Sequence, residues 1–165
     1  MNSTNLSNDT AIEIGNLIKN SQEIEKLIID SNNFGIEGAG YIAEGLKINS
    51  TIRTLSIQNC NIENEGLILL ADSFTNRTNI CEINISNNFI TEKGFKYFSE
   101  ILHFSNISRV ITNNNHIKDE SISNILIYLT SEKCKLKKLE MKNCKFSDKG
   151  LNYLITSSKN ITSLM

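Results

Sequence analysis

The sequence has no proline, no tryptophan and no excess of charge of either sign. Acidic and basic residues number 18 and 17, so no net charge draws the chain towards nucleic acid or a membrane surface. No apolar run approaches the roughly 20 residues of a membrane-spanning helix. The polar start MNSTNLSNDT lacks the apolar stretch of a secretory signal peptide. We expect neither a nucleic-acid nor a membrane partner, and a location in the cytoplasm, or in a host cytosol if the chain is a secreted effector.

Cysteine and histidine are few, and neither is spaced for metal binding. Cys60, Cys81, Cys134 and Cys144 form no CxxC pair, and neither histidine stands at ligand spacing from them. The sequence also contains no GxSxG, P-loop or HExxH motif. It therefore predicts no metal, no cofactor, no catalytic residues and no enzymatic activity.

The chain does contain a strong internal repeat. Segments with the pattern LxxLxLxx(N/C)x(L), in which Ile, Val, Phe or Met can replace Leu, begin at residues 24, 52, 80, 107 and 136. A glycine follows in four of these units, and apolar residues at helical spacing come after it. The fourth unit is the weakest match, because it has Ser121 in place of glycine and Thr112 in place of an apolar strand residue. Each unit is predicted to form a strand, a turn and a helix that stack on a shared core.

The repeat resembles the ribonuclease-inhibitor-like class of leucine-rich repeats. That resemblance implies an α/β solenoid, a right-handed βα superhelix with a parallel sheet on its concave face and helices on its convex face. It covers residues 10–165, namely a partial repeat at 10–23, the five repeats and a partial strand at 161–165, after a polar N-terminal segment at 1–9. The consensus Asn or Cys should bond to backbone groups in the turn after each strand. These residues are Asn32, Cys60, Asn88, Asn115 and Cys144.

Two finer predictions follow from the repeat. Cys60 and Cys144 hold equivalent positions three repeats apart, and parallel strands about 4.8 Å apart would separate them by roughly 15 Å. Because that is beyond disulfide reach, all four cysteines are predicted to be reduced. Thr91 and Ser147 are plausible N-caps of the repeat helices, and Asn88 should be buried whereas Asn87 should be exposed.

A repeat solenoid of this kind predicts a protein-binding module. The first hypothesis is a non-enzymatic scaffold that binds a protein partner, as a microbial effector or a fragment of a larger receptor. The second is a regulator of an enzyme, such as an enzyme inhibitor or a GTPase activator, because some GTPase activators use this repeat type. Arg109 beside an acidic residue on an exposed ridge would favour the second hypothesis. A featureless, hydrated concave face would favour a third, a structural spacer.

The concave sheet is the predicted binding face. Side chains alternate along each strand, so the residues between the consensus positions should point outward. Arg109 with Ile111 is the preferred centre, because binding hot spots favour arginine and apolar anchors. Ile28 is a second outward isoleucine, although lone surface isoleucines are also ordinary. Lys138 and Lys142 make this face basic towards its C-terminal units, and the convex face is expected to have no apolar cluster.

Two features near the C-terminus remain. Seven lysines lie between Lys133 and Lys149, which indicates either a docking patch for an acidic partner, phosphates or anionic lipid, or a solvated edge. Ile161 and Leu164 begin a sixth strand with no polar capping repeat after it. An open apolar edge tends to pair with another surface, so self-association through this uncapped edge is predicted.

Overall fold

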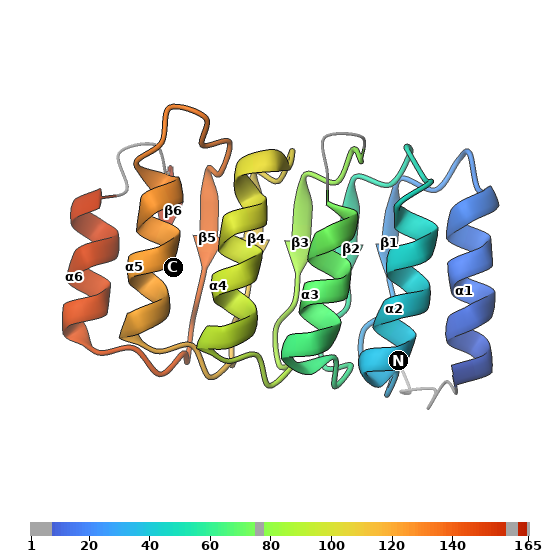
Figure 1. Cartoon of the computed structure of the whole chain (residues 1–165), viewed down its shortest axis with the longest axis horizontal. Helices are drawn as coiled ribbons and strands as arrows, with labels where there is room; N and C mark the ends of the chain where they lie inside the picture. Colours follow the sequence, from blue (N-terminus) through green and yellow to red (C-terminus); the bar gives the residue numbers. More distant parts are fainter. Residues whose placement is uncertain (1–7, 75–77, 158–161, 165) are drawn as a thin grey trace.

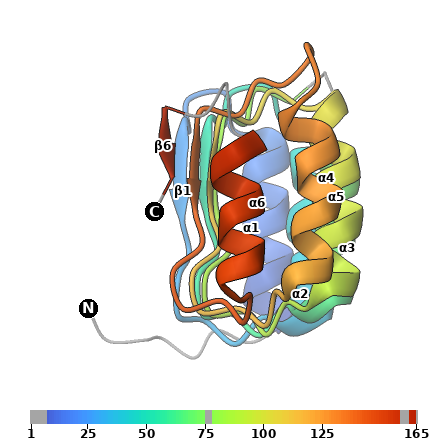
Figure 2. The ribbon, with the colours of Figure 1, turned by 90° about the vertical axis from the view of Figure 1, so that its left-hand side faces the viewer.

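A computed structural model describes residues 8–74, 78–157 and 162–164 of the chain. Within these ranges it is a row of alternating strands and helices (Figure 1). The six strands form one parallel sheet in chain order, β1-β2-β3-β4-β5-β6. Viewed along the row, the strands lie on one side and the helices on the other (Figure 2). The elements are α1 (Asn8–Asn20), β1 (Lys26–Ile28), α2 (Gly35–Leu46), β2 (Thr54–Ser56), α3 (Glu63–Ser73), β3 (Glu82–Asn84), α4 (Glu92–Ile101), a 3-10 turn η1 (Leu102–Phe104), β4 (Arg109–Ile111), α5 (Asp119–Leu129), β5 (Lys138–Glu140), α6 (Asp148–Ser157) and β6 (Ser163–Leu164).

The strand register confirms the predicted repeat. Each unit contributes its fourth residue to the middle of a strand, and neighbouring units pair at this position. Four of the five side chains are fully buried and form one edge of the core. The chain therefore has the predicted leucine-rich-repeat solenoid fold. The paired residues are Leu27, Leu55, Ile83, Val110 and Leu139.

The consensus Asn forms the bonds predicted for it. Asn88 is fully buried, and its side-chain oxygen accepts from the backbone N–H of Cys60 at 2.9 Å in the preceding repeat. Its amide nitrogen donates to the carbonyls of Ile57 at 2.8 Å and Ser86 at 3.1 Å. One side chain thus supplies hydrogen-bond partners to backbone groups in two turns, where regular secondary structure provides none.

The fourth unit, the weakest match by sequence, has a polar residue directly after its strand that finds a hydrogen-bond partner in the core. The Thr112 hydroxyl stands where other units have an apolar strand residue, is buried, and accepts from the amide nitrogen of Asn115 at 3.0 Å. Because the buried hydroxyl has a partner, the polar residue is tolerated in the core.

The turn after each strand needs a left-handed residue, which explains a second asparagine beside the consensus one. Asn87 has φ 56° and is half-buried, so the prediction that it is exposed is wrong. Asparagine enters this region more readily than other residues with side chains. The equivalent residues, with φ between 54° and 61°, are Ser31, Asn59, Asn114 and Asn143.

Helix starts are capped from the preceding repeat as well as locally. Thr91 and Ser147 accept from the backbone N–H groups of Lys93 and Lys149, as predicted for N-caps. The Asn64 oxygen also accepts from the backbone N–H groups of Thr91 at 2.9 Å and Gly94 at 3.1 Å.

This cross-repeat cap explains one of the recurring glycines. A Cβ on Gly94 would lie only 2.7 Å from the Asn64 oxygen, so any side chain there would displace the cap. Ser121 holds this position in the fourth unit, and its buried hydroxyl has no partner among the described residues.

The described array begins with a helix and ends with a strand. Helix α1 begins at Asn8, so the expected boundary between residues 9 and 10 falls within its first turn. At the other end, Leu164 pairs with Leu139, whereas Ile161 lies outside the described residues.

Helix α6 exposes side chains at positions that are buried in the core in α4. Leu151 and Ile155 are 40% and 58% exposed, whereas Phe95 and Ser99, which hold the same positions in α4, are buried. No described repeat covers this side of α6. Ile127 on α5 is 69% exposed, so at least one apolar side chain also lies exposed on the helix layer.

Candidate protein-binding face

The outward strand residues form rows across the sheet, because equivalent positions pair in register. A third row continues in the turns that follow the strands. None of these side chains is aromatic. The rows are Lys26–Thr54–Glu82–Arg109–Lys138, Ile28–Ser56–Asn84–Ile111–Glu140 and Asp30–Gln58–Ser86–Asn113–Lys142.

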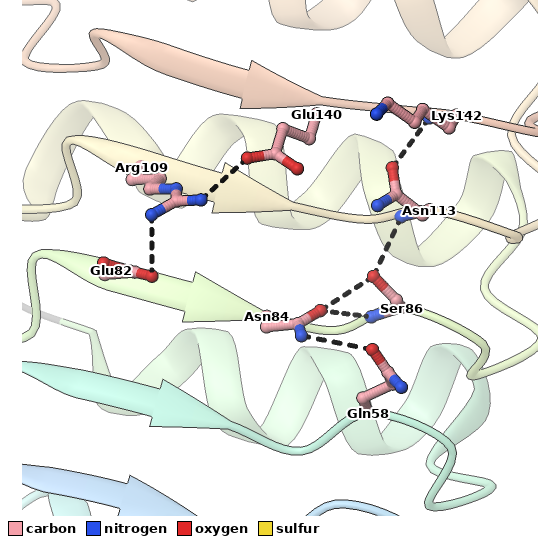
Figure 3. A network of polar contacts seen from close by, with 8 residues as sticks. All are labelled: Gln58, Glu82, Asn84, Ser86, Arg109, Asn113, Glu140 and Lys142. Carbon is pink, nitrogen blue, oxygen red and sulfur yellow. Dashed lines mark hydrogen bonds and ion pairs between the residues drawn. The ribbon is translucent and has the colours of Figure 1, made fainter. Parts of the chain in front are cut away.

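Arg109 lies between two carboxylates on neighbouring strands (Figure 3). Its guanidinium is 2.8 Å from a Glu140 oxygen and 3.3 Å from a Glu82 oxygen. The hydrogen bond to Glu140, supported by the charge of Glu82, raises the pKa of Arg109 above its ordinary value. The Arg109 side chain is 35% exposed and its Nε is buried without a partner among the described residues. The guanidinium is therefore held against the sheet.

A chain of polar contacts crosses the C-terminal ends of four strands (Figure 3). Asn84 donates to the Gln58 oxygen at 3.3 Å and accepts from the Ser86 hydroxyl at 2.7 Å. That hydroxyl oxygen accepts from the backbone N–H of Asn113, whose side-chain oxygen accepts from the backbone N–H of Lys142 at 2.7 Å. These bonds fix the side chains in advance of binding, which lowers the ordering cost of an interface.

Four of the five predicted binding residues lie together. Arg109 and Lys138 are register partners on β4 and β5, and Ile111 is the partner of Glu140. Lys142 follows β5 in the next turn and is exposed, whereas Ile111 is only partly so. Ile28 is 57% exposed but lies on β1, three strands from β4 and roughly 14 Å away at a spacing of about 4.8 Å per strand. The structure therefore separates Ile28 from the others.

Two hollows flank these strands, and neither was predicted. One, of about 240 Å³, lies beside Arg109. The other, of about 740 Å³, lies where η1 meets the loop between α5 and β5, next to a contact between the rings of His103 and Tyr128 at 4.6 Å. Residues of the smaller hollow are Cys81, Glu82, Ser108, Arg109, Lys137 and Lys138. Residues of the larger are Glu100, His103, Phe104, Glu132, Lys133, Cys134 and Lys135.

The described residues contain no group of three or more His, Cys, Asp or Glu placed to hold a metal ion. Nor does any described helix have the length and apolar character needed to cross a membrane. All four cysteines are free thiols, as predicted. Burial raises the pKa of the Cys60 thiol to about 11, so this thiol stays protonated and hydrogen-bonded to the carbonyl of Ile29 at 3.3 Å.

Comparison with known proteins agrees with the geometry. A family model described as "Leucine Rich repeat" matches residues 49–71 and 132–154. Together with the in-register repeats, this match shows that the chain contains leucine-rich repeats.

Similar sequences come from much longer proteins. Protein CARMIL of Dictyostelium discoideum is 32% identical over 84 residues, which are 50% of this chain and 8% of that protein. FERM domain-containing protein C of the same organism is 31% identical over 96 residues, 58% of this chain and 6% of that protein. Mouse leiomodin-2 is 27% identical over 99 residues, 59% of this chain and 18% of that protein. The chain thus spans less than a fifth of the length of each.

Solved structures show the same fold. "Leiomodin-1 Actin-Binding Site 2 (ABS2)" superposes with a TM-score of 0.77 at 16% identity, covering 95% of this chain and 90% of that one. A Caenorhabditis elegans tropomodulin C-terminal domain superposes with a TM-score of 0.69 at 13% identity, covering 91% and 92% of the two chains.

Proposed function

We propose that the chain is a non-enzymatic protein-binding module whose concave face, centred on Arg109 and Ile111, contacts the partner. The observation that carries this proposal is the polar network on β2 to β5, which holds a row of outward side chains in fixed positions. A structural spacer would have no need for such a surface. Ile111, half-buried beside this network, offers an apolar anchor at its centre.

Actin is the partner to test first. The structure named for actin-binding site 2 of leiomodin-1 matches nearly the whole chain, and leiomodin-2 is also similar in sequence. Co-sedimentation with actin filaments and a titration of labelled actin monomers would measure the two forms separately. Binding to either form supports this partner, and binding to neither rejects it.

The variant that tests the face must leave the fold intact. Arg109→Glu is unsuitable because it would place three carboxylates side by side. The pair Arg109→Gln and Ile111→Ser removes the charge and the apolar anchor while keeping a hydrogen-bond donor. A matched control is Lys96→Gln with Ile127→Ser on the helices, where both residues are exposed. Loss of partner binding in the first pair alone supports the concave face, and loss in the control alone contradicts it.

The alternative function, regulation of an enzyme, divides into two cases. A GTPase activator would need an arginine that can reach the nucleotide, but Arg109 is bound on both sides and lies on the sheet rather than on an exposed ridge. An enzyme inhibitor is itself a protein-binding module, so the geometry favours the first hypothesis and includes this second case. A GTPase rate that stays unchanged on adding the chain would agree with this preference.

We place the module in the cytoplasm, supported by four cysteines that are free thiols, the state that a reducing compartment maintains. The ribonuclease-inhibitor-like subclass is also a proposal, supported by the alternation of Asn and Cys in the first three units. The effector and receptor-fragment settings both require a protein-binding module, so the binding assay above serves both.

A second surface supports self-association. Leu151 and Ile155 hold core positions in α6 but are exposed, beside the outer edge of β6. We propose a second copy of this chain as the occupant, since two such faces would cover each other's exposed apolar side chains.

A further inference from the structure

The last repeat and the loop before it are basic, whereas the rest of the chain is acidic. Residues 132–149 contain seven lysines and three acidic residues, a local charge of +4, although the whole chain has a net charge of −1. The remaining residues therefore carry −5. All seven lysines are exposed. They are Lys133, Lys135, Lys137, Lys138, Lys142, Lys145 and Lys149.

Within the described part of the chain, none of these lysines forms an ion pair with a carboxylate, although the charge of Lys149 contributes to the lowered pKa of Asp119. The ion pairs that involve lysine there lie in the helix layer, on α2 to α4. Lys135 donates to the Asn106 side-chain oxygen at 2.7 Å, and Lys149 lies 5.9 Å from the ring centre of Tyr153. The carboxylate on β5, Glu140, is bound to Arg109. The positive charge of this repeat is thus available to an external group.

Three of the lysines share the concave face. Lys137 and Lys138 line the hollow of about 240 Å³ beside Arg109. Lys142 lies at the other end of β5, four residues from Lys138 and therefore about 13 Å away at 3.3 Å per residue. Between these two ends, Ile111 on β4 faces outward beside Glu140, whose side chain is only 13% exposed. The face thus offers two positive positions with an apolar one between them.

We propose that this part of the concave face binds an acidic, extended segment of the partner protein. This inference rests on the proposed function and names the chemistry that the face recognises. One carboxylate of the segment enters the hollow, whose lining of one glutamate, one arginine and two lysines is net positive, and a second meets Lys142. An extended segment rises about 3.3 Å per residue, so the two carboxylates are four residues apart. The residue midway, on the same side, lies level with the register partners Glu140 and Ile111, and it packs on Ile111. The recognised pattern is acidic-x-apolar-x-acidic.

A protein segment fits this face better than a nucleic acid does. Single-stranded nucleic acid is bound by basic grooves with aromatic side chains on which bases stack, and none of the outward residues of the strand rows is aromatic.

The probe is the fluorescein-labelled peptide Gly-Ser-Glu-Ser-Leu-Ser-Glu-Gly-Ser, and its binding is followed by fluorescence anisotropy. A peptide with lysine in place of both glutamates is the charge control. The test protein carries Lys137→Gln, Lys138→Gln and Lys142→Gln. Its matched control carries Lys19→Gln, Lys96→Gln and Lys118→Gln, three exposed lysines outside this face.

The unmodified chain should bind the glutamate peptide and not the lysine peptide. The test variant should lose about tenfold in affinity, and the control variant should change by less than about twofold. Raising the ionic strength to about 0.15 M, where the screening length is about 8 Å, should weaken binding of the unmodified chain more than that of the test variant.

Equal loss in both variants, or equal binding of both peptides, would overturn the inference. So would tighter binding of a single-stranded DNA oligonucleotide or of phosphatidylserine vesicles than of the glutamate peptide. The proposed function is judged separately by the Arg109→Gln, Ile111→Ser pair. If that pair loses the partner while the lysine variant keeps it, the acidic segment is wrong and the protein-binding face stands. If neither loses it, the concave face itself is wrong.

Discussion

Replacing Asn88 by alanine should destabilise the chain, because this buried side chain bonds to backbone groups of two repeats. The change removes the acceptor for the Cys60 N–H and the donor to the Ile57 carbonyl. The Ser86 carbonyl keeps a second partner, the backbone N–H of Asn59 at 2.9 Å. The Cys60 N–H and the Ile57 carbonyl thus lose their short hydrogen bonds. Because each such loss costs about 1–3 kcal/mol, we expect the free energy of unfolding to fall by about 3 kcal/mol. For a chain of this size that lowers Tm by about 6–12 °C.

The array itself supplies an intermediate variant. Cys60 and Cys144 hold the same position, and their thiols donate to the carbonyls of Ile29 and Thr112, each at 3.3 Å. Asn88→Cys should therefore keep a donor for Ile57 and lose only the acceptor for Cys60, at a cost of about 1.5 kcal/mol, half that of alanine.

Urea unfolding with reductant present measures all variants, with Asn152→Ala on the exposed side of α6 as the control. We expect the control to stay within about 0.5 kcal/mol of the unmodified chain. Equal midpoints for Asn88→Ala and Asn152→Ala would refute the register, and a cysteine variant less stable than the alanine variant would refute the role of the donor.

Three further predictions concern other parts of the chain. Hydrogen bonds from the Ser147 hydroxyl and backbone N–H lower the pKa of Asp119, so the stability that Asp119 contributes is present above about pH 4, the ordinary pKa of aspartate, and is lost as pH falls through the lowered pKa. Asp119→Asn keeps a hydrogen-bond acceptor, as Asn64 does at the same position, and should therefore reduce the loss of stability in acid when unfolding midpoints are measured from pH 7 to pH 2.5. Parallel curves for the variant and the unmodified chain would contradict this prediction. Thiol titration in denaturant without reductant should find four free thiols. In the folded chain at pH 8, Cys60 should react most slowly, because burial holds the pKa of its thiol at about 11. Fewer than four free thiols, or a fast reaction at Cys60, would count against the fold. Sedimentation equilibrium should show concentration-dependent association that Leu151→Lys with Ile155→Lys removes and Ile127→Lys leaves unchanged; a strictly monomeric unmodified chain would end the proposal of self-association.

The repeat period was enough to predict the fold, because the same residues determine strand pairing and core burial. Leu55, Ile83 and Val110 are equivalent in the sequence pattern, and they are register partners in the sheet. The role of Asn88 could also be predicted, since an amide in an irregular turn has few other partners.

The charge pairing on the concave face was not predicted, although the alignment of the repeats contains its signal. Glu82 and Arg109 hold the same position in consecutive units, so their side chains are neighbours across two strands. The prediction considered Arg109 alone, and so it missed that two glutamates already bind its guanidinium. The exposure predicted for Asn87 was wrong for a related reason, because polarity says nothing of the backbone conformation that the turn requires.

The larger hollow could not be predicted from the repeat, because it forms where units differ. It lies beside the loop between α5 and β5, in the unit of 29 residues that begins at residue 107. A periodic pattern describes what units share, whereas the shape of such a loop depends on contacts such as the bond from the Lys135 backbone N–H to the Tyr128 hydroxyl at 3.0 Å. The position of the binding site on the concave face therefore stays a prediction, and the structure adds the charge pairing and the hollows.

Site-specific photo-crosslinking tests the central claim, binding through the concave face, even while the partner is unidentified. A photoreactive phenylalanine analogue replaces Thr54 on β2, outside the polar network, in one protein and the exposed Lys96 on α4 in another, and each is irradiated in an extract of the source cells. The account predicts a discrete crosslinked protein from position 54, reduced by the Arg109→Gln, Ile111→Ser pair, and none from position 96. Crosslinking from position 96 alone would show that the partner binds the helices, and the concave-face account would be wrong.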